Sequence, residues 1–108
     1  MANESRVAAL QEILKESPND AFARYALGLE YSSAGDAEAA LSEFRQLLAA
    51  HPDYTNGYFM AAQVLERVGR FAESRQMLEQ GIATAERTNN RHALSEMQDM
   101  LDLLPASD

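Results

Sequence analysis

Residues 18–52 read PNDAFARYALGLEYSSAGDAEAALSEFRQLLAAHP, and a proline stands at each end of this stretch. Proline disrupts helix interiors, so each proline favours a helix boundary. Near the middle, Gly35 suits a chain reversal, and Asp36 directly after it is a good helix N-cap. The stretch therefore predicts two helices, at about 20–34 and 37–50, joined by a tight turn.

The same pattern recurs at an offset of 34 residues, since Pro18 is matched by Pro52 and Gly35 by Gly69. We call this offset the repeat period. Side-chain character is kept at the same offset in five further pairs: Tyr25/Phe59, Tyr31/Leu65, Ala34/Val68, Phe44/Leu78 and Leu48/Ile82. A fixed period of this length indicates a repeated supersecondary unit.

Apolar residues recur at three and four positions throughout the chain, which is typical of helices that each bury one stripe. We predict six helices, at residues 3–16, 20–34, 37–50, 54–68, 71–87 and 90–104. The connections are only a few residues long, so consecutive helices should be antiparallel neighbours. The sequence thus predicts an all-α stack of helical hairpins.

One known family has this period. Leu27-Gly28, Tyr31, Ala40, Phe44 and Pro52 resemble the pattern of the tetratricopeptide repeat (TPR) at the matching spacing. The resemblance implies a single TPR-like domain over residues 1–108, an α-solenoid with two full repeats flanked by half-repeats. Its parts are an N-terminal half-repeat at 3–17, repeat one at 19–52, repeat two at 53–87 and a C-terminal capping helix at 90–104.

Two positions of the first repeat depart from the family pattern. Arg24 stands where a large aromatic residue is usual, although Tyr58 provides one in the second repeat. Leu47 stands where a small residue is usual, whereas Gly81 follows the pattern. The packing around Leu47 should therefore differ from that of a regular repeat.

The resemblance also implies a function, because TPR-like stacks hold a peptide or a helix of a partner protein on a concave face lined by the first helix of each unit. By the repeat register, that groove would be lined by Phe22, Tyr25, Leu29, Asn56, Phe59, Gln63, Arg67 and Met97. Helical apolar spacing is also typical of core, so Tyr25, Leu29 and Phe59 could instead pack between adjacent first helices.

A second hypothesis is structural self-association. A homodimer could form through the apolar faces of the two terminal helices, with Val7, Leu10 and Leu14 at one end and Met97, Leu101 and Leu104 at the other.

Composition argues against other classes of function. The 17 acidic residues outnumber the 9 basic ones for a net charge of −8, which disfavours nucleic acid as a partner. There is no cysteine, and His51 and His92 lack the spacing of a metal motif. No phosphate-binding loop or nucleophile motif is present, so we expect no enzyme, no cofactor and no metal. With neither a signal peptide nor a long apolar run, we expect a cytoplasmic protein without a membrane partner.

Overall fold

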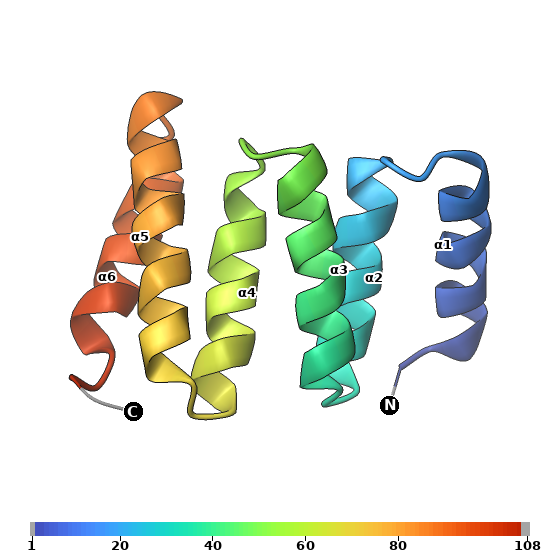
Figure 1. Ribbon diagram of the computed structural model, residues 1–108, viewed down its shortest axis with the longest axis horizontal. Helices are drawn as coiled ribbons and strands as arrows, with labels where there is room; N and C mark the ends of the chain where they lie inside the picture. Colours follow the sequence, from blue (N-terminus) through green and yellow to red (C-terminus); the bar gives the residue numbers. More distant parts are fainter. Residues whose placement is uncertain (1, 107–108) are drawn as a thin grey trace.

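The computed structural model describes residues 2–106 as a row of antiparallel helices in which each packs on the next (Figure 1). Within these residues there are six helices and no strands: α1 (Glu4–Glu16), α2 (Ala21–Ser33), α3 (Ala37–Ala50), α4 (Thr55–Arg67), α5 (Phe71–Arg87) and α6 (Arg91–Leu103). Besides sequential neighbours, α2 touches α4 and α4 touches α6. The predicted all-α hairpin stack is confirmed; residues 1, 107 and 108 of the predicted domain lie outside the described residues.

Helix ends agree closely with the sequence prediction. The predicted bounds of α3 and α5 match the structure, and the other four helices are shorter by one residue at one or both ends. The extra residues are caps rather than helical residues: Asn3, Asp20 and Asn90 each accept a backbone N–H bond on the side-chain oxygen at 2.8–3.1 Å. Asp36 caps α3 in the same way, as predicted.

Left-handed residues end three of the helices. Gly35 and Gly69 have φ of 79° and 80°, and Asn89 has φ of 59°. Glycine takes this conformation without a steric cost, and asparagine tolerates it better than most residues. The glycines of the repeat therefore allow the chain to reverse at the ends of α2 and α4.

Phe44 of α3 is the centre of the first core cluster and is 0% exposed. Its ring lies directly on the backbone of α2, since a Cβ built on Gly28 would be 2.5 Å from Phe44 Cε1. Only a glycine at position 28 leaves room for the ring in this arrangement. Helices α2 and α3 can thus pack closely because the large side chain of Phe44 lies over a residue that has no side chain.

The unusual Leu47 is accommodated by a glycine on the next helix. Leu47 is buried, and a Cβ on Gly57 of α4 would lie 3.2 Å from its Cδ2 atom and 2.9 Å from that of Leu48. One repeat period after Leu47 stands Gly81 of α5, and the side chains of Met97 of α6 and Tyr58 of α4 fill the space beside it.

Arg24 replaces the expected aromatic residue and keeps one of its contacts. Its Nη2 donates to the carbonyl oxygen of Pro18 at 2.8 Å, and Tyr58, one repeat period later, donates its hydroxyl to the carbonyl of Pro52 at 2.8 Å. Arg24 Nη1 also lies 2.9 Å from Glu43 Oε1, with the two side chains 17% and 15% exposed. The arginine therefore joins the turn before α2 to helix α3.

We predict that Gly28→Ala destabilises the protein by about 1–2 kcal/mol, because the gain in helix propensity is smaller than the cost of moving the buried Phe44 ring. Gly57→Ala is the matched control. Its new methyl group meets the flexible end of Leu48, so its free energy of unfolding should stay within about 0.5 kcal/mol of the wild type. Urea unfolding followed by circular dichroism measures both, and equal losses in the two variants would contradict the role given to Phe44.

Candidate functional site

Helices α2 and α4 present equivalent surfaces. They have the same length and begin one repeat period apart, so Tyr25 on α2 corresponds to Phe59 on α4, and Leu29 corresponds to Gln63. Near the N-terminal ends, Phe22 corresponds to Asn56. We call these six residues the α2–α4 face: Phe22, Tyr25, Leu29, Asn56, Phe59 and Gln63.

Phe22 is the most open position of this face. It is 70% exposed, and among the large hydrophobic residues that the structure describes only Leu103 is more exposed, at 81%. Full burial of a phenylalanine side chain is worth about 2 kcal/mol. Phe22 therefore offers an apolar contact that the fold itself does not use.

Tyr25 and Leu29 are partly buried and pack against the first core cluster. The Tyr25 ring has its centroid 5.2 Å from that of Tyr54 and 6.1 Å from that of Phe44. Burial raises the pKa of the Tyr25 hydroxyl, and the neighbouring Tyr54 phenol adds to the rise. These side chains thus support the stacking of α2 on its neighbours and keep a part of their surface exposed.

On α4, Phe59 is half-buried against the second core cluster, which contains residues of α4, α5 and α6. Asn56 is exposed and Gln63 is partly exposed. Within residues 2–106, neither side-chain amide has a hydrogen-bond partner. Both amides are therefore available to donors and acceptors of another molecule.

Arg67 already has a structural contact. Its Nη1 lies 3.3 Å from the Oγ atom and 3.4 Å from the carbonyl oxygen of Ser32, which joins the C-terminal ends of α4 and α2. The rest of the side chain is exposed, so Arg67 stays at the edge of the α2–α4 face.

The placement of Met97 in a partner groove is wrong. Met97 is 0% exposed and belongs to the second core cluster, where its sulfur fills the space beside Gly81 that a Cβ would otherwise occupy. A flexible thioether suits such an irregular gap. The repeat register alone predicts that position 97 lies in the groove. In the structure the Met97 side chain instead fills the space that Gly81 of α5 leaves in the core.

The residues suggested for a homodimer contact also face inward. Leu10 is buried with Ala23 and Leu27 of α2, and Val7 and Leu14 pack against the same cluster. At the other end, Leu101 and Leu104 pack against the second core cluster. These apolar faces attach the terminal helices to the stack, and Val7, Leu14, Leu101 and Leu104 keep a part of their surface exposed.

Residues 2–106 offer neither a metal cluster nor a membrane span. In that part of the chain no three acidic, histidine or cysteine side chains lie close enough together to hold a metal ion. None of the helices from α1 to α6 is both long and apolar enough to cross a membrane.

Comparison with known proteins agrees with the repeat. A family model described as tetratricopeptide repeat matches residues 31–97. The chain belongs to the TPR family. A TPR repeat-containing protein of Pseudomonas aeruginosa is 32% identical over 91 residues, which cover 84% of this chain and 87% of that protein.

Two solved structures are similar as well. The solution structure of a TPR domain protein from Salinibacter ruber has a TM-score of 0.73 at 34% identity, and the match covers 78% of this chain and 85% of that one. A Bordetella parapertussis protein has a TM-score of 0.77 at 26% identity, covering 89% and 84%. TPR domains generally mediate protein–protein interactions and are typically not catalysts.

The raised pKa of Tyr25 predicts a loss of stability in alkali. The unfolded chain releases the phenol proton near pH 10, whereas the folded chain releases it only at higher pH. The free energy of unfolding should therefore fall as pH rises above about 10, and less steeply in Tyr25→Phe, in which the raised pKa of Tyr54 remains. Urea titrations between about pH 8 and pH 11 measure this, and identical slopes for the two proteins would contradict it.

Proposed function

We propose that this TPR protein is a non-catalytic scaffold that holds a short segment of a partner protein, extended or helical, on the α2–α4 face. The observation that carries the proposal is the exposed ring of Phe22 on α2 together with two side-chain amides on α4, Asn56 and Gln63, that have no hydrogen-bond partner among the described residues.

The composition of the face fits a polypeptide ligand. Tyr25, Leu29 and Phe59 offer a partly exposed apolar centre, and such a centre inside a polar rim is typical of interaction hot spots. Amide side chains bond peptide groups, since they both donate and accept hydrogen bonds. A partner segment would thus bury apolar side chains on the centre and satisfy its backbone on the rim.

Because Met97 is buried, the face has two lining helices rather than three. Neighbouring helices lie about 10 Å apart. At about 3.3 Å per residue, an extended segment that crosses two helices would therefore contact the face over roughly three or four residues. The proposal accordingly specifies a short linear motif or one face of a helix.

We predict that Phe22→Ala combined with Gln63→Ala reduces partner capture at least about fivefold, since an exposed aromatic anchor and an unbonded amide are both removed. Neither residue is a buried core residue, so the melting temperature should change by less than about 4 °C. The measurement is quantitative mass spectrometry of proteins retained from a lysate of the source organism.

The matched control is Ile13→Ala, which removes a 43% exposed apolar side chain from α1, a helix that contributes no residue to the α2–α4 face. It should retain the same proteins as the wild type. Partners that are lost equally from both variants, or retained by both, would mean that the α2–α4 face does not bind them.

A further inference from the structure

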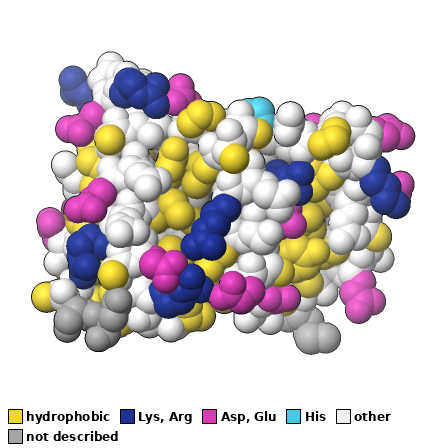
Figure 2. Space-filling view, viewed as in Figure 1, with side chains coloured by type: hydrophobic (Ala, Val, Ile, Leu, Met, Phe, Trp, Pro, Cys, Tyr) yellow, Lys and Arg dark blue, Asp and Glu magenta, His cyan; other side chains and the backbone are white. Residues whose placement is uncertain are grey.

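Three surface grooves recur along the stack at the spacing of the repeat. We name them by the helices that line them. The α1–α3 groove has a volume of about 510 Å³, the α3–α5 groove about 410 Å³ and the α5–α6 groove about 480 Å³. Equivalent apolar residues line all three, namely Leu14, Leu48 and Ile82, each one repeat period after the last. Figure 2 shows the first two as apolar strips, one on each side of α3.

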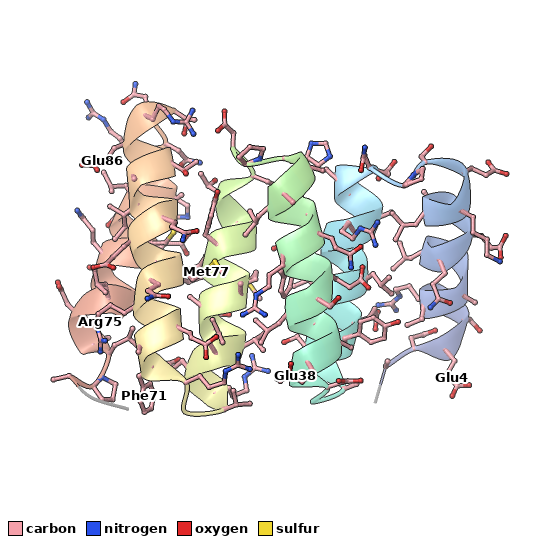
Figure 3. All side chains as sticks on the ribbon, in the orientation of Figure 1. Glu4, Glu38, Phe71, Arg75, Met77 and Glu86 are labelled. Atoms are coloured by element: carbon pink, nitrogen blue, oxygen red, sulfur yellow. The ribbon has the colours of Figure 1, made fainter. Side chains whose placement is uncertain are left out.

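In the first two grooves the next helix of the stack provides the opposite wall. Glu43 of α3 lines the α1–α3 groove, and Met77 of α5 lines the α3–α5 groove, where Figure 3 shows it on the side of α5 toward α4. Among residues 2–106 no further helix walls the α5–α6 groove. The open side of the α5–α6 groove is therefore the place where a following helix packs in the earlier units.

The exposed side of α6 does not suit an ordinary repeat helix. Asp99 and Asp102, which line the groove, are exposed, and Asp99 corresponds to the buried Leu65 of α4. A helix with an apolar face would desolvate these carboxylates without pairing them, which is costly. The occupant of this groove must therefore carry positive charge.

Of the three grooves, only the α5–α6 groove has charged lining residues that are all acidic. Its apolar residues Ile82 and Leu101 are flanked by four acidic side chains, and no basic residue lines the groove. The four acidic residues are Glu79, Glu86, Asp99 and Asp102. By contrast, Arg45 and Glu73 face each other across the α3–α5 groove at 3.4 Å.

These four carboxylates have no partner in the described part of the chain, neither an ion pair nor a hydrogen bond. Arg75, one turn before Glu79 on α5, donates instead to the carbonyl oxygen of Pro105 at 2.5 Å. Elsewhere the acids are mostly paired or act as caps, as Glu43 does with Arg24 and Asp53 with Arg87.

We propose that the α5–α6 groove docks a cationic amphipathic helix of a partner protein, in the position that a following helix occupies in the earlier units. Leucine-type side chains of the ligand contact Ile82 and Leu101, and its Lys or Arg side chains pair with the carboxylates. Glu79 and Glu86 are seven residues apart, or about 10.5 Å along α5. Cations seven residues apart on the ligand helix match this spacing.

A second copy of the chain is a poorer occupant. The chain carries a net charge of −8, and its first helix exposes Glu4, Glu12 and Glu16. Bringing such a helix to the groove places like charges together, which opposes association.

The test uses a synthetic helix of about 14 residues with Leu on one face and Lys on the other, and the same peptide with Glu in place of Lys. The groove variant is Glu79→Gln with Asp99→Asn and Asp102→Asn. The control variant neutralises three other unpaired acids, Glu4→Gln with Glu16→Gln and Glu66→Gln, so that both variants have a net charge of −5.

We expect the wild type to bind the Leu/Lys peptide, with the Leu/Glu peptide showing no binding in calorimetry. The groove variant should lose about tenfold in affinity and the control variant less than about threefold, because exposed ion pairs each contribute modestly and act locally. Phe22→Ala should leave the affinity unchanged, which separates this groove from the α2–α4 face. In ¹⁵N-labelled protein, amide shifts should gather around Ile82 and Leu101.

Equal losses in the two charge variants, or shifts centred on α2 and α4, would overturn the proposal and assign the binding to diffuse charge or to the other face. Sedimentation of the chain without peptide tests the remaining occupant. A dimer that is lost in the groove variant but kept in the control variant would replace the cationic partner with a second copy.

Discussion

The whole stack depends on matching a large side chain with a glycine where helices cross. Phe44 lies over Gly28 inside the first hairpin, Leu47 and Leu48 lie against Gly57 between hairpins, and Met97 lies beside Gly81 at the end of the stack. At Gly28 and Gly81 this close packing fixes the distance between neighbouring helices, because a methyl group on the glycine would overlap the buried Phe44 or Met97 side chain, whereas at Gly57 the flexible end of Leu48 can move aside. Each of these crossings joins helices that are adjacent in the stack. The surfaces of α2 and α4 that are not used in these crossings are therefore left to contact another molecule.

The secondary structure could be predicted from the sequence because its signals are local. Proline, glycine and the apolar period of each helix lie within a few residues of the boundaries that they set, and the errors fall on capping residues such as Asp20 and Asn90. The burial of Met97 depends on the size of position 81 on another helix, so a repeat register that treats all units alike places it wrongly. Likewise, the role of Arg24 becomes clear only once its bond to Pro18 can be compared with that of Tyr58 to Pro52.

The two proposed binding surfaces differ in chemistry for a physical reason. Several acidic side chains are paired with arginines or bond to helix N-termini, as Glu38 does with Arg70 and Asp36 with the first turn of α3. On the α2–α4 face the exposed groups are aromatic rings and amides, which suit a peptide of little charge. At α5 and α6 there is no following helix among the described residues to supply arginines, so the carboxylates stay unpaired and their field extends into solvent.

The most direct test of partner binding by the α2–α4 face is photo-crosslinking in cells of the source organism. Benzoylphenylalanine is placed at position 22 in one protein and, in the other, at position 46 of α3, which is also exposed but belongs to the other helix of the hairpin. If the face holds a partner, position 22 gives a discrete cross-linked product and position 46 does not. Products of equal yield from both positions, or from position 46 alone, would show that partners are held elsewhere.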